Sequence, residues 1–414
     1  MSDFKFLHVA DLHLGSPFHG LALREEHVAR RFARAGREAF TALIGRAIEE
    51  KVAFVVIAGD VFDGTWRDNT IGLYFNRELA RLERAGIEVF LLKGNHDAES
   101  VVARSIPLPA SVKSFGAEAP TTLKIDHLKV ALHGQSFAHR AVTDNLAIKY
   151  PHQVAGWFNI GVLHTALTGH PPHEPYAPAT PGHLRARGYD YWALGHVHDF
   201  EILQSSPYIV YPGNLQGRNM RERGEKGGVL VRVEDSKVAA VDRIIVDRVR
   251  WLELKVDASA APSEAALLKQ VEDLGQSLAD VAAERAVVAR VVLAGDTPLH
   301  RTLVAHRDQL TEAVQAALHR LHGDIWLERL EISTRMPRQR VRSDAAMRAI
   351  DLGALLDAVQ PGEEFAQKAR EQLSALRERM PGTVPALEQD LASELDRLIA
   401  EARDLLLTRA ADEA

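Results

Sequence analysis

Metal-ligating side chains stand at the ends of five short apolar runs in the first half of the sequence. They are Asp11 and His13, Asp60, the triplet Asn95-His96-Asp97, His164, and the pair His196 and His198. In an open α/β sheet, ligand sites assemble at the carboxyl ends of the strands. We therefore expect these side chains to converge on one pocket.

The spacing within these groups favours a shared target. Asp11 and His13 are separated by one residue, as are His196 and His198, so extended backbone points both members of a pair to the same side. Gly94 allows a sharp turn before the Asn95-His96-Asp97 triplet. A lone histidine near a strand end usually has a structural role, but five such groups in succession favour a common site.

The ligand types indicate the kind of metal. Mixed imidazole, carboxylate and amide oxygen ligands suit borderline divalent ions such as Mn²⁺, Fe²⁺ or Zn²⁺ better than an all-oxygen Mg²⁺ or Ca²⁺ site. The number of ligands exceeds one tetrahedral zinc site and suits two ions about 3.5–4 Å apart that share a carboxylate. Such a pair activates a bridging water and clamps two phosphoryl oxygens, which is what phosphoester hydrolysis requires.

Alternating strand and helix patterns must position these residues. Strand patterns at 4–10, 52–58 and 87–93 alternate with helical spacing over 25–50 and 71–85. More strand patterns follow at 122–134, 158–164 and 189–196, and the runs 208–214 and 227–233 resemble a hairpin pair. We predict an α/β fold whose layered core, in residues 1–248, has mixed β-sheets flanked by helices.

Two further regions are predicted after this core. Residues 249–334 alternate strands at 251–257, 285–295 and 324–332 with helices at 263–282 and 299–321, which predicts a small βαβαβ cap domain. Residues 335–414 begin with an Arg-rich linker and continue as a helical C-terminal region. Its amphipathic segment 387–407 fits either a helix docked on its own domain or a module that docks on a partner.

Composition excludes several classes of protein. With 50 Lys+Arg against 56 Asp+Glu, the net charge is −6, so any DNA contact must come from local basic patches. The absence of cysteine excludes disulfides and thiolate metal sites and fits a reducing compartment. No apolar run reaches the roughly 18 residues of a membrane helix, and the N-terminus is not a secretory signal, so we expect a cytoplasmic protein with no membrane contact.

Taken in order, the motifs D-x-H, G-D-x-x-D, G-N-H-D, H and G-H-x-H resemble the calcineurin-like metallophosphoesterase superfamily over about the first 200 residues. The segments LHVADLHLG, DYWALGHVH and YPGNLQGRNMRERGEKGG further resemble the SbcD/YhaO branch of DNA repair exonucleases. The context of His164, LHT followed by PYAP, resembles the YhaO subgroup.

The resemblance implies a role for each matching residue. It assigns Asp11, His13 and His198 to one metal, Asn95, His164 and His196 to the other, and Asp60 to a bridging position. His96 would be the catalytic residue, acting beside the scissile phosphate on the leaving oxygen. Asp63 and Asp97 match acids of the motifs that orient the ligands.

Arginines after the YPGN turn are candidates for phosphate contact. Arg218 and Arg221 carry guanidinium groups that match phosphate oxygens. The alternative is a charged, solvated hairpin tip, because Glu222 and Glu225 stand in the same segment.

These observations lead to one functional hypothesis and two alternatives. The first is a Mn²⁺-dependent DNA nuclease, an exonuclease with or without endonuclease activity, that hydrolyses phosphodiesters in DNA repair with two divalent metal ions. The resemblance further implies a homodimer working with an SbcC-like coiled-coil ATPase. The alternatives are a metallophosphatase or cyclic-nucleotide phosphodiesterase acting on small phosphoesters, which the net negative charge mildly favours, and a scaffold without activity, which predicts lost ligands.

Overall fold

The computed structural model describes residues 3–16, 26–63, 69–99, 108–167, 177–337 and 367–368. Two compact units divide the chain. The first comprises Met1–Glu253, Ser277–Arg290 and His322–Glu328, and the second comprises Leu254–Gln276, Val291–Leu321 and Arg329–Ala414. Apart from residues 367–368, the predicted C-terminal helical region and most of the Arg-rich linker before it lie outside the described residues.

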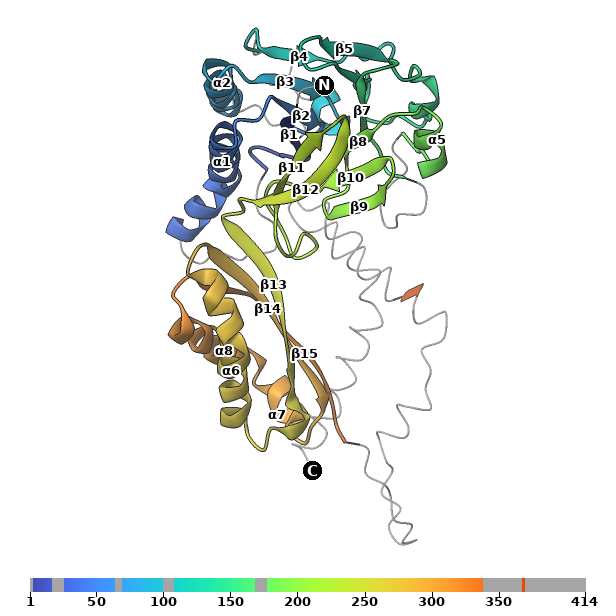
Figure 1. The fold of residues 1–414 in the computed structure, drawn as a ribbon. Helices are drawn as coiled ribbons and strands as arrows, with labels where there is room; N and C mark the ends of the chain where they lie inside the picture. The colour runs from blue at the N-terminus through green and yellow to red at the C-terminus, as the bar shows by residue number, and fades with distance from the viewer. Residues whose placement is uncertain are drawn as a thin grey trace, which may run out of the picture. The chain divides into compact units, whose positions relative to one another are not determined.

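The first unit is built on two six-stranded mixed sheets (Figure 1). One has the order β12-β11-β1-β2-β3-β4, with β1 Phe4–Val9, β2 Phe54–Ala58, β3 Glu88–Leu92, β4 Val112–Ser114, β11 Gly227–Glu234 and β12 Lys237–Ile245. The other has the order β5-β6-β7-β8-β10-β9, with β5 Thr121–Ile125, β6 Val130–Gly134, β7 Phe158–His164, β8 Tyr191–Gly195, β9 Phe200–Ser205 and β10 Tyr208–Pro212. Strands β1 to β4 run parallel, as do β6, β7, β8 and β10.

Apolar side chains from alternate strand positions fill the space between the two sheets and the space under the helices. Phe6 and Phe54 of the first sheet pack in one core with Phe158 and Tyr191 of the second. The neighbouring position Leu7 points the other way, toward the helices, because side chains alternate along a strand. Each buried strand therefore contributes to two cores.

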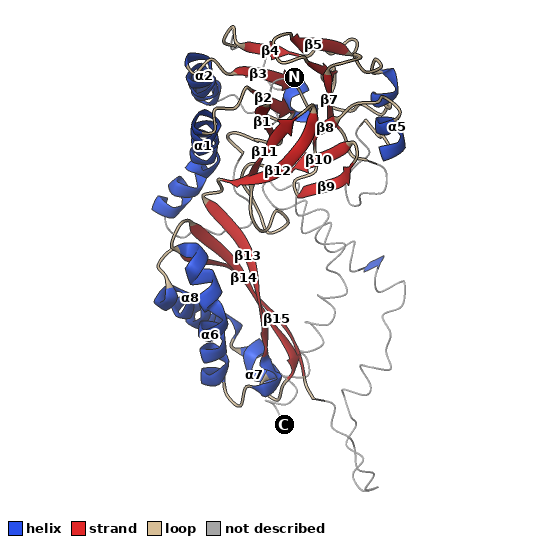
Figure 2. Cartoon of the chain, viewed as in Figure 1, coloured by secondary structure: helices blue, strands red, loops and turns tan. Residues whose placement is uncertain are grey.

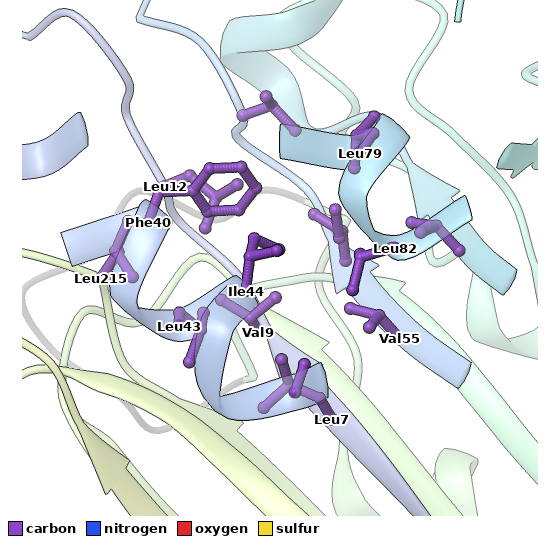
Figure 3. Packing of buried hydrophobic residues seen from close by; sticks show 14 of the residues in the cluster. Leu7, Val9, Leu12, Phe40, Leu43, Ile44, Val55, Leu79, Leu82 and Leu215 are labelled. Atoms are coloured by element: carbon purple, nitrogen blue, oxygen red, sulfur yellow. The ribbon is translucent and has the colours of Figure 1, made fainter. Parts of the chain in front are cut away.

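Two long helices cover the outer face of the first sheet (Figure 2). They are α1 Glu26–Glu49 and α2 Asn69–Arg84. Figure 3 shows side chains of α1 and α2 packed against those of β1 and β2, and it labels Leu7, Val9, Leu12, Phe40, Leu43, Ile44, Val55, Leu79, Leu82 and Leu215. The prediction of a layered α/β core with mixed sheets and flanking helices is confirmed.

Shorter helical segments lie between the strands of these two sheets. They are α3 Asn95–Glu99, η1 Ala147–Lys149 and α5 Pro181–Arg185. Helix α3 begins directly after β3, so the Asn95-His96-Asp97 triplet forms the first helical turn rather than extended backbone.

A third sheet has the order β13-β14-β15, with β13 Val249–Asp257, β14 Ala286–Asp296 and β15 Ile325–Arg335. Segments η2 Ala258–Ala260 and α6 Glu264–Ala282 connect the first two strands, and α7 His300–Ala305 and α8 Arg307–Leu321 connect the last two. The predicted βαβαβ order is confirmed, with the helix expected at 299–321 divided into two. The domain limits at residues 248 and 334 stay a prediction.

One predicted pairing is wrong. The runs at 208–214 and 227–233 do not form a hairpin, because they lie in different sheets. Strand β10 pairs with β9 and β8, whereas β11 pairs with β1 and β12. No strand was predicted for β9, which pairs with β10, or for β12, which pairs with β11.

No helix among the described residues combines the length and apolarity that a membrane crossing requires.

Candidate metal centre

Candidate metal ligands follow the ends of β1, β2 and β8, and several of them have unusual backbone conformations. Asp11, His13, Asp60 and His196 have φ values of 50°, 41°, 53° and 98°, which non-glycine residues rarely adopt. The prediction that Asp11 and His13 converge through extended backbone is therefore wrong in its reason, since both lie beyond β1 on a turn. Strained backbone of this kind is typical of functional sites.

Asp11, His13 and His198 form one cluster. Their candidate ligand atoms all lie within 4.8 Å of one another. The Nε2 atoms of His13 and His198 are 3.2 Å apart. Asp11 is 1% exposed, and it accepts a hydrogen bond from the backbone N–H of His196 at 2.9 Å.

The other predicted ligands gather around His164. Its Nε2 lies 2.9 Å from Asn95 Oδ1 and 3.3 Å from Asp60 Oδ2. The opposite ring nitrogen, Nδ1–H, donates to the carbonyl of Ala58 at 3.0 Å and so fixes the ring. The ring centroid of His196 is 5.2 Å from that of His164.

Asp60 connects the two groups. Its carboxylate, that of Asp11 and an imidazole nitrogen of His164 lie within 4.8 Å of one another. The structure thus brings together the seven side chains that were predicted as ligands. Their division between two metals stays a prediction.

Charge interactions perturb the buried groups strongly. Burial raises the pKa of Asp11 to about 6. Burial alone would also raise the pKa of Asp60, but the neighbouring His164 outweighs it and holds that pKa below the usual range. For His164, burial would lower the pKa, yet the Asp60 carboxylate raises it to about 9. The Asp60 carboxylate therefore favours a positive charge beside it, which a protonated His164 or a bound cation supplies.

The residues present fit a divalent metal. Nδ1 of His13 is buried without a hydrogen-bond partner among the described residues, and the Asp63 carboxylate oxygen lies 3.9 Å from it. Nε2 of His13 directly faces another imidazole nitrogen, on His198, an arrangement that a shared metal ion explains. Imidazole, carboxylate and amide oxygen together are a donor set for borderline divalent ions.

His96 lies at the rim of the cluster and contacts Asp63. Its Nδ1–H donates to Asp63 Oδ1 at 2.9 Å, and its backbone N–H donates to Asp60 Oδ1 at 3.0 Å. Burial by itself would lower the pKa of His96, but the hydrogen bond to Asp63 raises it overall. His13, Asp63 and His96 also bring their ligand atoms within 4.8 Å, so Asp63 lies close enough to contact a metal itself.

Asp97 ties together the loops that carry the ligands. Its carboxylate accepts hydrogen bonds from the backbone N–H groups of Val61 and Phe62 at 3.0 Å and of Gly94 at 3.1 Å. Burial raises its pKa to about 6. These contacts fix the backbone around Asp60 and Asn95, in keeping with the orienting role expected for Asp97.

Of the two candidate arginines, one faces this centre. The side chain of Arg218 is 15% exposed and lies 3.5 Å from Asp63 and 3.3 Å from Ser16 Oγ, whereas Arg221 is exposed. Glu222 was not predicted as part of the site, yet it is 5% exposed and bonds both Arg218 and His198. The segment is therefore not a solvated tip at this residue.

Comparisons with known proteins identify the family of the chain. The sequence profile of the calcineurin-like phosphoesterase family matches residues 4–200, the part of the chain that carries all seven candidate ligands. The chain belongs to the calcineurin-like metallophosphoesterase family.

Within that family, the middle domain of the metallophosphoesterase YhaO matches residues 251–335. The chain is 33% identical over 340 residues to YhaO of Bacillus subtilis, named an uncharacterized metallophosphoesterase, covering 81% of this chain and 83% of the relative. It is 29% identical to the DNA double-strand break repair protein Mre11 of Methanopyrus kandleri, covering 54% and 51%. It is 24% identical to a protein of Escherichia coli K12 that is named as a subunit of the nuclease SbcCD, covering 58% and 68%.

Proposed function

We propose that the protein is a two-metal DNA nuclease, with exonuclease activity, that hydrolyses phosphodiester bonds in DNA repair and prefers Mn²⁺. The observation that carries this proposal is the meeting of Asp11, His13, Asp60, Asn95, His164, His196 and His198 at one rim of the two sheets. The relatives named as Mre11 and as a subunit of a nuclease support DNA as the substrate.

Each residue has a place in the proposed reaction. Asp11, His13 and His198 would hold one ion, Asn95, His164 and His196 would hold the other, and Asp60 would contribute to both sites. A bound pair supplies Lewis-acid activation of the phosphodiester and of the attacking water. His96, whose protonated form is favoured by its bond to Asp63, donates a proton to the leaving oxygen.

The proposal is tested with purified full-length protein, MnCl₂ and end-labelled linear duplex and single-stranded DNA. We expect progressive shortening from the ends, none with EDTA, and DNA binding that weakens more than tenfold between about 50 and 200 mM salt. Closed circular DNA tests for endonuclease activity. Hydrolysis of bis(p-nitrophenyl) phosphate without any cleavage of DNA would establish the small-phosphoester alternative instead.

The proposed partners follow from the same relatives. We further propose that the protein is a cytoplasmic homodimer bound to an SbcC-like coiled-coil ATPase. The relative named as a subunit of the nuclease SbcCD supports the existence of a partner subunit. The test is co-purification of the chain with such an ATPase and measurement of nuclease activity with and without ATP. Equal activity and no association would remove the ATPase from the proposal.

A further inference from the structure

Glu222 is a buried carboxylate with an unusual number of contacts. It lies in the loop before β11, and its side chain is 7% exposed. Oε1 accepts a hydrogen bond from Nδ1–H of His198 at 2.9 Å, and Oε2 accepts one from the amide of Asn214, also at 2.9 Å. Both oxygens also bind the guanidinium of Arg218, whose Nη2 is 2.6 Å from Oε1.

These contacts make Glu222 the link between a candidate metal ligand and a candidate phosphate contact. The carboxylate holds the His198 ring by Nδ1, which leaves Nε2 facing the cluster, 3.2 Å from Nε2 of His13. On its other side Glu222 fixes Arg218, whose Nη1 reaches Ser16 Oγ at 3.3 Å and Asp63 Oδ2 at 3.5 Å. Asp63 in turn binds His96, so a continuous series of contacts connects His198 to His96.

His164 offers a comparison within the same site. Its ring is fixed by a backbone carbonyl, that of Ala58, so no side-chain substitution removes this bond. The ring of His198 instead depends on one carboxylate. A carboxylate bound to the free nitrogen of a metal-ligating histidine fixes its tautomer and raises its basicity.

We propose that Glu222 is a positioning residue with two roles, and the inference rests on the proposed metal site. It orients His198 so that Nε2 binds metal, and it holds the Arg218 guanidinium at the same rim to bind a phosphate oxygen of the substrate. Burial of the ion pair keeps both side chains in one geometry, because an unpaired charge there would be costly. The arginine thus binds phosphate from a fixed position rather than as a mobile surface group.

The first role is tested by metal binding, without turnover. Glu222→Gln keeps the size of the side chain but removes its charge and replaces one acceptor oxygen by an amide donor, so it cannot accept all the bonds from His198, Asn214 and Arg218. Titration of MnCl₂ into metal-free protein is expected to show about 10–100-fold weaker binding of one Mn²⁺. Glu225→Gln is the matched control, because Glu225 is in the same loop and pairs with Arg243 instead. Equal Mn²⁺ affinity in Glu222→Gln and wild-type protein would overturn this role.

The second role is tested by inorganic phosphate binding to Mn²⁺-loaded protein, measured by calorimetry. Arg218→Ala is expected to bind phosphate at least about tenfold more weakly, with Mn²⁺ affinity retained. Arg218→Lys is expected to lie between the two, because it keeps the charge and loses the forked geometry. Unchanged phosphate affinity in Arg218→Ala would refute the phosphate contact.

A measurement on the wild-type chain covers the case in which the variants do not fold. With Zn²⁺ bound, ¹⁵N spectra of the histidine rings are expected to show His198 protonated on Nδ1. Protonation on Nε2 would overturn the positioning role. If wild-type protein binds Mn²⁺ and phosphate as described but cuts no DNA, the nuclease proposal fails and this inference stands.

Discussion

At the scale of single residues, the candidate centre depends on backbone turns that brace one another. The backbone N–H of Asp11 donates to the carbonyl of Gly59, and that of His13 donates to the carbonyl of Asp60, both at 3.0 Å. The loops after β1 and β2 therefore hold each other in conformations that neither would adopt alone. The candidate ligands are consequently preorganised by backbone contacts, and small changes in those loops should affect metal binding.

Gly94 offers a sharp test of this preorganisation. A Cβ atom at this position would lie 2.3 Å from Asp60 Oδ1 and 2.9 Å from the Asp60 backbone nitrogen, so Gly94→Ala must displace Asp60. We expect fewer than two Mn²⁺ per chain after dialysis, measured by mass spectrometry of the metal, and at least a hundredfold loss of hydrolysis. Gly36→Ala in α1 meets open space and should keep its Mn²⁺, with helix stability raised by about 1 kcal/mol. Two tightly bound Mn²⁺ in Gly94→Ala would contradict the bridging role proposed for Asp60.

His96 should separate proton transfer from metal binding. His96→Ala is expected to lower DNA cleavage about 10²–10⁴-fold, the usual contribution of a general acid, while the Mn²⁺ content stays near two. Metal content and initial rates are measured on the same preparation. His127→Ala, an exposed histidine in the turn between β5 and β6, is the control and should cleave normally. Loss of metal together with activity would show that His96 is a ligand.

At the scale of elements, the sequence predicted which segments form the strands that carry the ligands better than it predicted which strands pair with one another. The run 52–58 is apolar throughout and 158–164 is mostly apolar, so their strand character can be recognised from the local sequence. Which strands pair with each other is set by long-range packing. For this reason residues 208–214 and 227–233 lie in different sheets although they are neighbours in the sequence. The sequence also did not predict that Glu222 is buried, because its burial depends on the loop folding back onto His198.

His8 links the two sheets and should make stability depend on pH. Its Nε2–H donates to the carbonyl of Leu194 at 3.1 Å, and the hydroxyl of Tyr191 donates to its Nδ1 at 3.0 Å, so β1 is bonded to β8 through a neutral ring. Complete burial lowers the pKa of His8 from 6.5 to about 3, although the Leu194 carbonyl opposes this shift. Above pH 6.5 the ring is neutral in both states. Below it the unfolded chain binds the proton first, so folded stability falls by about 1.4 kcal/mol per pH unit toward pH 3.

The measurement is urea unfolding in EDTA at pH 7.5, 6.5 and 5.0, for wild-type protein and His8→Gln. The variant should be less stable at pH 7.5, because its shorter amide cannot make both bonds. Between pH 6.5 and 5.0 it should lose about 2 kcal/mol less than wild-type protein. His127→Gln, which changes an exposed histidine, should keep the wild-type pH dependence. Parallel pH profiles for His8→Gln and wild-type protein would contradict a buried neutral His8.

At the scale of the whole molecule, the proposed dimer needs a surface, and α1 and α2 supply a candidate. A cavity of about 1110 Å³ runs along these helices. Its lining combines apolar and aromatic groups, Leu73 and Tyr74, with six arginines and two glutamates, some of them from residues 248–249 and 284–285. In an isologous interface each patch meets its own copy, so the two glutamates can pair with arginines of the other copy, and apolar contact must outweigh the repulsion between the remaining arginines.

Leu73 is the residue on which this dimer depends. It is 65% exposed, more than any other large apolar side chain in the described part of the chain. Leu73→Glu places a charge at the centre of the proposed interface and is expected to give the mass of one chain by light scattering, where wild-type protein gives two. Ile148→Glu is the matched control, because Ile148 is 53% exposed on η1 and should leave the dimer intact. A dimer that survives Leu73→Glu but not Ile148→Glu would move the interface to the second sheet, since the apolar contact that holds two copies together must lie where a buried charge disrupts it.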